Sequence, residues 1–147
     1  MVAAVEIETV DETEKGTFLV DRASVKSMLA DNVMDGAIVN IASTIAETGL
    51  ALATPYSASK GGVVSPTRAV ALGVATRGIR VNAISPGPVD RLLLAKLPAH
   101  VVATIVEKTA LKLKARDEQI AETIAFMCIP KASYMTGAAV VAGGIII

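Results

Sequence analysis

The sequence predicts an α/β fold in which a small parallel sheet is covered by helices. The chain has 147 residues, a length typical of one domain. Hydrophobic residues make up 52% of it and aromatic residues only 3%, so its core must consist of aliphatic side chains, which suit buried parallel strands. Helical and strand-like segments also alternate along the chain, an order typical of parallel strands joined by right-handed crossovers.

The first third of the chain contains one readable helix and one readable strand. Residues 1–14 show no clear pattern, and their VEIETV stretch fits either a short strand or the start of a helix. From Gly16 to about Ala30, apolar side chains recur at helical spacing. The apolar run AIVNIA at 37–42 indicates a buried strand. Since both faces of this strand are apolar, we expect a neighbouring strand on each side of it.

The middle of the chain is expected to hold a loop and then a long helix. Small residues fill 43–54, which favours a loop. Pro55 suits the first turn of a helix, where no amide hydrogen bond is lost, and this helix would end at Gly78. Pro66 is expected to kink it, at a cost of about 3 kcal/mol if unrelieved. Gly73 would weaken the next turn by up to about 1 kcal/mol.

A second strand and a further helix follow. Residues 79–85 (IRVNAIS) form an apolar strand that the Pro-Gly-Pro turn at 86–88 stops. Residues 92–108 are expected to be helical apart from Pro98. The histidine in this region, His100, is the only one in the chain, and we expect it on the surface rather than in a metal site.

The last quarter of the chain is expected to add a helix and a third strand. Asp117 suits the N-cap of an amphipathic helix that Pro130 ends. Residues 138–142 (AAVVA) form the third strand. The single cysteine, Cys128, cannot form an internal disulfide, and its apolar neighbours predict a buried small side chain.

Charge and composition exclude several function classes. Lys and Arg total 14, Asp and Glu also total 14, and the charges are scattered, so no nucleic-acid partner is expected. No apolar run reaches the roughly 20 residues that span a bilayer, so no membrane partner is expected. The acidic start does not fit a secretory signal. An intracellular, cytoplasmic protein is therefore expected.

Three polar residues are spaced for chemistry on a carbonyl or alcohol. Ser43 follows the strand at 37–42, and ligands of open α/β sheets bind at the carboxyl ends of strands. Tyr56 and Lys60 are four residues apart, so they share one face of the predicted helix. A nearby ammonium favours the phenolate form of a tyrosine, which can then exchange a proton near neutral pH. A serine hydroxyl can hold the same substrate oxygen, whereas a hydride must come from a cofactor.

Other segments surround these residues in an order typical of one family. They are GTFLV at 16–20, AIVNIAS at 37–43, YSASKGG at 56–62, GIRVNAISPGPV at 78–89 and SYMTGAAVVAGG at 133–144. With them, the Ser, gap, Tyr-x-x-x-Lys motif resembles that of the short-chain dehydrogenase/reductase family, in its smaller cytosolic branch. The segments are similar to those of both 3-oxoacyl-carrier-protein reductases and hydroxysteroid dehydrogenases.

The resemblance implies a fold and a set of partners. The fold would be a partial Rossmann-type, doubly wound parallel sheet with flanking helices, corresponding to the carboxy-terminal portion of such a dehydrogenase. It would form a single domain over residues 1–147, poorly defined over 1–14. The cofactor would be NAD or NADP, the substrate a small molecule, and the assembly a homodimer or homotetramer. No metal is implied.

The resemblance also implies a role for each motif residue. Ser43 would polarise the substrate oxygen, and Tyr56 would be the catalytic acid and base. Lys60 would favour the phenolate of Tyr56 and hold the nicotinamide ribose, so both residues would also contact the cofactor. Pro86, Gly87 and Val89 would flank the nicotinamide. The asparagine at 82 would be structural.

The sequence departs from the family pattern at several positions. No glycine-rich cofactor turn precedes Gly36, so we expect the amino-terminal cofactor half of the family to be missing. Thr13 stands where the family has a catalytic asparagine. Arg91 replaces a threonine, and it would either contact a phosphate or be exposed. Ala142 replaces the usual aspartate before the final Gly-Gly.

Two functions remain open from the sequence. The first is an oxidoreductase that transfers a hydride between the nicotinamide cofactor and a hydroxyl or keto group of a small or lipid-like substrate, of 3-oxoacyl or steroid type. The alternative is a truncated, non-catalytic relative that serves as an oligomerisation or interaction module. In the family, helices equivalent to 15–31 and 56–77 pack across a two-fold axis.

Overall fold

The computed structural model describes residues 2–51 and 53–144 of the chain. Its elements are α1 (Val2–Ala30), β1 (Gly36–Ile41), α2 (Ile45–Thr48), α3 (Thr54–Val74), η1 (Ala75–Arg77), β2 (Ile79–Pro86), α4 (Leu92–Ala95), α5 (Ala99–Glu107), α6 (Asp117–Cys128), η2 (Pro130–Ala132) and β3 (Ala139–Ala142). Among the helices of these residues, none is both long and apolar enough to cross a bilayer.

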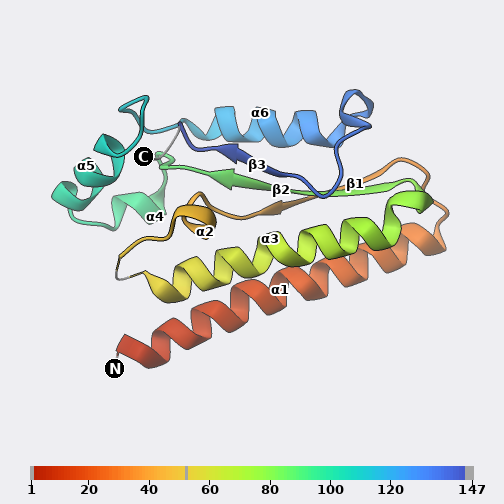
Figure 1. Cartoon of the computed structure of the whole chain (residues 1–147), viewed down its shortest axis with the longest axis horizontal. Coiled ribbons are helices and arrows are strands. Elements are labelled where there is room, and N and C mark those ends of the chain that lie inside the picture. The colour runs from red at the N-terminus through yellow and green to blue at the C-terminus, as the bar shows by residue number, and fades with distance from the viewer. Residues whose placement is uncertain (1, 52, 145–147) are drawn as a thin grey trace.

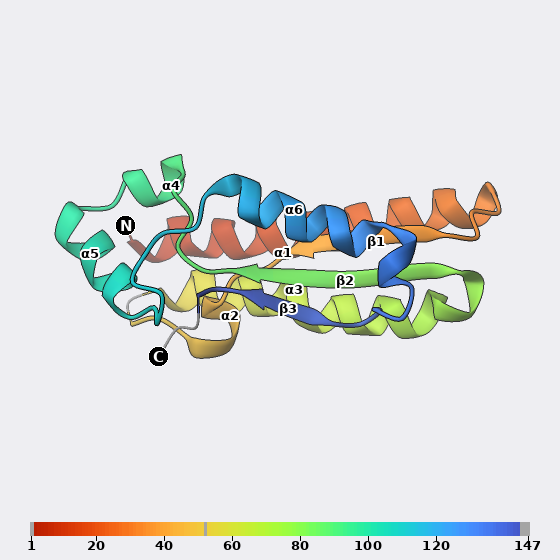
Figure 2. The same cartoon turned by 90° about the horizontal axis from the view of Figure 1, so that it is seen from above.

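Three parallel strands in the order β1-β2-β3 form the sheet, as the alternation of elements predicts. Helices α1 and α3 lie side by side on one face, and α6 covers the other face (Figures 1 and 2). The short helices α4 and α5 lie beyond the carboxyl ends of the strands (Figure 1). This layered, Rossmann-like arrangement confirms the predicted fold class.

Aliphatic side chains fill the space between the sheet and the α1–α3 layer. In one cluster, Val63 and Val64 of α3 pack near Ala83 of β2. The other cluster lies nearer the amino ends of the strands and contains Ala71, Val74, Ile79 and Val81, with Val25, Met28, Leu29, Ile38 and Val70 against it. The core therefore contains no aromatic ring among these residues, in keeping with the composition.

Strand β1 differs from its prediction in having one neighbour instead of two. Within the described part of the chain it pairs only with β2, from Gly36 opposite Ile79 to Ile41 opposite Ile84. Helices rather than a second strand account for its apolar residues, because α1, α3 and α6 all contact it. Its outer edge remains unpaired among the described residues.

Helix α1 begins much earlier than the sequence predicts. The segment over 1–14, which showed no pattern, is helical from Val2, while residue 1 lies outside the described residues. The VEIETV stretch is therefore helix, not strand. The physical reason is tertiary, because α1 packs along α3, which stabilises a helix that local periodicity does not reveal.

Helix α3 contains Pro66 and is not ended by it. Its last turn tightens into η1, and Gly78 then takes a positive φ of 73°. A side chain at Gly78 would also meet the carbonyl oxygen of Met34, at 2.3 Å from an added Cβ, so only glycine fits this turn. The α-helix thus ends at Val74, and the 3₁₀ turn η1 continues the helical segment to the predicted end at Gly78.

Three local predictions are wrong. The loop at 43–54 contains one helical turn, α2. The helix at 92–108 is divided into α4 and α5, because Pro98 becomes the N-cap of α5. Asp117 is the first residue of α6 rather than its N-cap, which is Arg116. The side chain of Gln119 accepts the Arg116 N–H at 2.9 Å and so caps this helix.

Cys128 is exposed, not buried as predicted. It ends α6, and the neighbouring Met127 points into the core instead, where it is fully buried. The rotation of 100° per residue on a helix explains why an apolar run does not bury each of its members. His100 is exposed, as predicted.

A polar network crosses the layer between the helices and the sheet. The Asn40 side-chain amide of β1 donates to Asp21 Oδ2 of α1 at 2.8 Å and to Thr67 Oγ1 of α3 at 2.9 Å. Asp21 is only 1% exposed, and its second oxygen, Oδ1, has no hydrogen-bond partner among the residues that the structure describes. Burial raises the pKa of the Asp21 carboxyl, and the hydrogen bond from Asn40 opposes this effect.

A buried arginine ties β2 to the end of α6. The Arg80 guanidinium donates to the carbonyl oxygens of Met127 at 2.8 Å and Ala132 at 3.1 Å, and also to those of Cys128 and Ile129. These carbonyls include groups that a helix leaves without partners at its carboxyl end. Arg80 therefore serves as a side-chain cap for α6 from the adjacent strand.

Asp21→Asn is expected to raise the Tm at neutral pH. Because the folded-state pKa of Asp21 lies above the unfolded value, its favourable contribution is fully present below the unfolded pKa of about 3.9 and is lost as pH rises through the folded pKa. The gain should therefore be largest at neutral pH and vanish in acid, as thermal unfolding at several pH values will measure. The exposed control Asp35→Asn should change the Tm little, and an equal gain there would contradict the prediction.

Arg80→Met is expected to lower the free energy of unfolding by about 3 kcal/mol, because it leaves buried carbonyls without a donor. Urea titration followed by circular dichroism measures this loss. The matched control is Arg77→Met at an exposed site, for which a change within about 0.5 kcal/mol is expected. Similar losses in both variants would show that Arg80 does not cap α6.

Candidate active site

The carboxyl ends of the three strands converge with the start of α3 at one end of the sheet (Figure 1). Pairing continues past the strands there, since the Thr44 N–H donates to Pro86 O at 3.0 Å and the Gly87 N–H donates to Ala142 O at 3.1 Å. The segments that follow β1, β2 and β3 are thereby held together. This is the end at which open α/β sheets bind ligands.

Two glycines allow these segments to approach closely. A Cβ added to Gly87 would lie 2.6 Å from the carbonyl oxygen of Gly143, and one added to Gly143 would lie 2.4 Å from the Thr44 side chain. Both distances are too short for any side chain. The end of the sheet beneath the site is therefore a compact backbone surface.

Ser43 lies two residues after β1, where the sequence predicts it, and it is buried. Its Oγ accepts the N–H of Ile45, the first residue of α2, at 3.3 Å. Because this contact uses a lone pair of the oxygen, the hydroxyl proton remains able to donate. Helix α2 therefore orients a serine that can donate to a substrate oxygen.

Tyr56 and Lys60 lie one turn apart in the first turns of α3, as predicted, and both are half-buried. The Lys60 ammonium donates to the carbonyl oxygen of Ile41, the last residue of β1, at 3.0 Å. Burial lowers the pKa of the Lys60 amine. An ammonium has three N–H donors, so the contact with Ile41 leaves two for other partners.

The residues predicted to flank a nicotinamide lie at the end of β2 and in the turn that follows it. Pro86 and Gly87 are half-buried, and so is Val89. Val89 forms an isolated parallel bridge with Ala115, in which the Ala115 N–H donates to Pro88 O at 2.8 Å. This turn is thus fixed on both sides, by β3 and by the segment that leads into α6.

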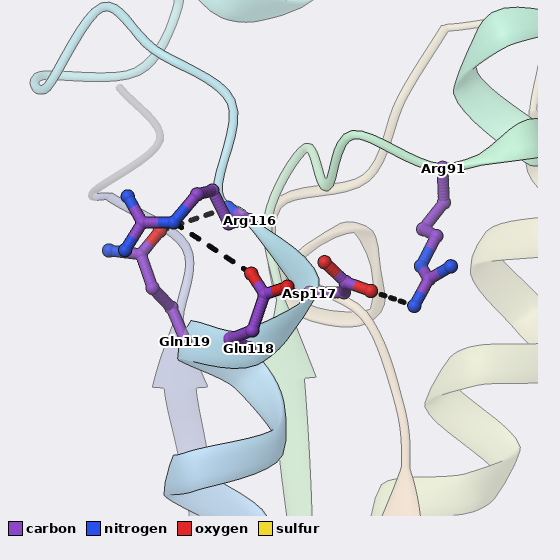
Figure 3. Close-up of polar contacts among 5 residues, drawn as sticks. All are labelled: Arg91, Arg116, Asp117, Glu118 and Gln119. Carbon is purple, nitrogen blue, oxygen red and sulfur yellow. Dashed lines mark hydrogen bonds and ion pairs between the residues drawn. The ribbon is translucent and has the colours of Figure 1, made fainter.

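Two ion pairs that the sequence does not predict join the segment after β2 to the residues around the start of α6. Arg91 pairs with Asp117 in the first turn of α6 (Figure 3), and Lys114 pairs with Asp90 at 2.5 Å. The Arg91 side chain is exposed, and the expectation of a phosphate contact stays a prediction. Pairs of opposite charge far apart in sequence give no signal in a single chain, so this contact was missed.

Thr13, at the position of the family's asparagine, lies within α1 and is half-buried. Its carbonyl oxygen accepts the hydroxyl of Thr17 at 2.8 Å. Asn82, predicted to be structural, donates to Met135 O at 2.8 Å and accepts the Ala138 N–H at 3.0 Å. It thus joins β2 to the segment before β3, and its structural role is evident from these two bonds.

Comparisons with known proteins match this arrangement. A family model described as enoyl-(acyl carrier protein) reductase matches residues 7–145. The cis-4-hydroxycyclohexanecarboxylate dehydrogenase of Sinomonas cyclohexanicum is 44% identical over 109 residues, which are 74% of this chain and 44% of that protein. The human (3R)-3-hydroxyacyl-CoA dehydrogenase is 35% identical over 132 residues, 89% of this chain and 50% of its own length.

A 3-oxoacyl-[acyl-carrier-protein] reductase of Rickettsia felis is 34% identical over 130 residues, 88% of this chain and 53% of that protein. Among solved structures, 4-hydroxyisoleucine dehydrogenase complexed with NADH superposes with a TM-score of 0.81 at 25% identity, over 92% of this chain and 56% of that one. The chain thus spans about half the length of the relatives it matches.

Gly87→Ala is expected to destabilise the end of the sheet by about 2 kcal/mol or more, because the new methyl group would overlap the backbone of Gly143. The control is Gly73→Ala in the last turn of α3, where an added Cβ would meet no described atom of another element within 4 Å. That substitution should stabilise the protein by up to about 1 kcal/mol. Chemical denaturation of both variants measures the two effects, and changes of the same sign would contradict this description of the strand ends.

Proposed function

We propose that this chain, a member of the short-chain dehydrogenase/reductase family, is an oxidoreductase that transfers a hydride between NAD or NADP and a hydroxyl or keto group of its substrate. The observation that carries the proposal is the bond from Lys60 to Ile41 O. It fixes the helix that bears Tyr56 against the strand that leads to Ser43. The proposed catalytic residues are therefore Ser43, Tyr56 and Lys60.

In this proposal, the three side chains handle one oxygen atom of the substrate. The Tyr56 hydroxyl gives that oxygen a proton during reduction and removes it during oxidation. Ser43, whose Oγ already accepts the Ile45 N–H, donates its proton to the same oxygen and stabilises the negative charge that develops there. Lys60, held by the Ile41 carbonyl, supplies a positive charge one turn along α3 from Tyr56.

The residues present also suit a nicotinamide cofactor. The free donors of Lys60 and the hydroxyl of Tyr56 suit the hydroxyl groups of a ribose, and Gly87, which has no side chain, lies half-buried between Pro86 and Val89 at the strand ends. When bound, the cofactor supplies or takes up the hydride. We assign Tyr56, Lys60, Pro86, Gly87 and Val89 to its binding.

The names of the relatives support a substrate class. They refer to a hydroxycyclohexanecarboxylate, 3-hydroxyacyl and 3-oxoacyl compounds, and hydroxyisoleucine. All of these carry a hydroxyl or oxo group in a small or lipid-like molecule with a carboxyl or acyl group. We propose a substrate of this kind.

We further propose a homodimer or homotetramer in the cytoplasm. Large apolar side chains of the α1–α3 layer are exposed, among them Phe18, Leu19, Val20 and Leu72, which supports an association surface. The exposed free thiol of Cys128 suits a reducing compartment. The same apolar residues would serve the alternative function, an oligomerisation module without catalysis.

Tyr56→Phe is expected to reduce turnover by about 10²–10⁴-fold, because the variant lacks the proton-transfer group. The rate is measured by NADH absorbance with 3-hydroxyacyl thioesters and 4-hydroxycyclohexanecarboxylate as candidate substrates. The matched control is Tyr134→Phe at the other, fully exposed tyrosine, which should leave the rate unchanged. Unchanged turnover in Tyr56→Phe would refute the assignment, and a stable dimer that binds no nicotinamide cofactor would favour the interaction module.

A further inference from the structure

Two adjacent residues of β1 bind α3 at two points. The Asn40 side-chain amide donates to Thr67 Oγ1 at 2.9 Å, and the carbonyl oxygen of Ile41 accepts the Lys60 ammonium at 3.0 Å. Lys60 and Thr67 are seven residues apart, which is close to two turns, so both lie on the face of α3 that meets β1. The part of α3 that bears Tyr56 and Lys60 is therefore also held by Asn40, which does not belong to the Ser-Tyr-Lys motif.

The direction of each bond follows from the backbone. The Ala42 N–H donates to Ile84 O of β2 at 2.8 Å. In a trans peptide the carbonyl points opposite to the N–H, so the Ile41 carbonyl points away from β2, toward the unpaired edge where Lys60 meets it. The Asn40 side chain instead leaves the plane of the sheet toward the helices, as its partners on α1 and α3 show.

Every donor of the Asn40 amide is used. One N–H bonds to Asp21 Oδ2 at 2.8 Å and the other to Thr67 Oγ1, while the Thr67 hydroxyl donates its own proton to Val63 O at 2.7 Å. These bonds fix the orientation of the Asn40 amide, because its NH₂ group must face the two oxygens that accept from it, on Asp21 and Thr67. Asp21 thus holds Asn40 from α1 in the orientation that Thr67 requires.

These bonds add direction to the contact between α3 and the sheet. Val63 and Val64 pack near Ala83 through apolar contacts, which have no preferred direction. Hydrogen bonds near 2.9 Å weaken steeply with displacement. The bonds at Asn40 and Ile41 are thus directional contacts that favour one position of α3 along β1.

We propose that Asn40, held by Asp21, is a positioning residue that acts through Thr67 to place Lys60 at the Ile41 carbonyl and so sets the position of Tyr56 along β1. The role in catalysis rests on the proposed function, whereas the placement of Lys60 does not. Neither Asn40 nor Asp21 touches the reacting atoms, so their effect passes through the position of α3.

Thr67→Val tests the placement, because it removes the hydroxyl and keeps the branched shape. The readout is the pH of half-maximal labelling of the Lys60 amine by acetic anhydride, followed by peptide mass spectrometry, with exposed Lys26 as the internal reference. We expect the Lys60 midpoint to move toward that of Lys26 by at least half of their difference. Thr67→Ser, which keeps the hydroxyl, should retain the midpoint of the unmodified chain.

Asn40→Ala is the second variant and must shift the Lys60 midpoint in the same direction, so the test does not depend on one substitution that fails to fold. Circular dichroism identifies the folded variants. An unchanged midpoint in folded Thr67→Val or Asn40→Ala would overturn the proposal, and so would an equal shift in Thr67→Ser. The labelling needs neither cofactor nor turnover, so its outcome is independent of whether the proposed activity is found.

Discussion

The attachment of α3 to the end of β1 is the interaction on which the candidate site depends. Tyr56 and Lys60 belong to the helix and Ser43 to the segment after the strand, so their relation is set by how the two elements dock. Apolar packing brings the layers together, whereas the bonds made by Asn40 and Ile41 determine where along the strand the helix stops. Stability and placement thus come from different kinds of contact.

Much of the fold and the placement of the motif residues could be predicted because both have local signals. Strands β1, β2 and β3 appear as apolar runs bounded by Gly and Pro, and Tyr56 and Lys60 share a helix face because they are four residues apart. The early start of α1 could not be predicted, since it depends on α3. The ion pair of Arg91 and Asp117 could not be predicted either, because these residues are 26 positions apart in the chain. A position in an apolar run likewise did not reveal that Cys128 faces outward.

Close backbone contacts lie next to the candidate site, whereas ion pairs lie at the exposed surface around it. Gly87 and Gly143 permit backbone contact that no side chain could replace, and Arg80 anchors α6 from beneath. Around them, the ion pairs of Arg91 and Lys114 are exposed, and exposed pairs contribute little to stability. The described site is therefore built on the sheet and α3, whereas α4 and α5 pack mainly against each other.

Among the residues that the structure describes, the outer edge of β1 has no partner strand. An open strand edge is a template on which strands of other molecules can add, and natural proteins often discourage this by placing lysine there. Lys60 occupies the last carbonyl of that edge, at Ile41, and brings a positive charge to it. The side chain proposed to act in catalysis thereby also covers one backbone acceptor of this edge.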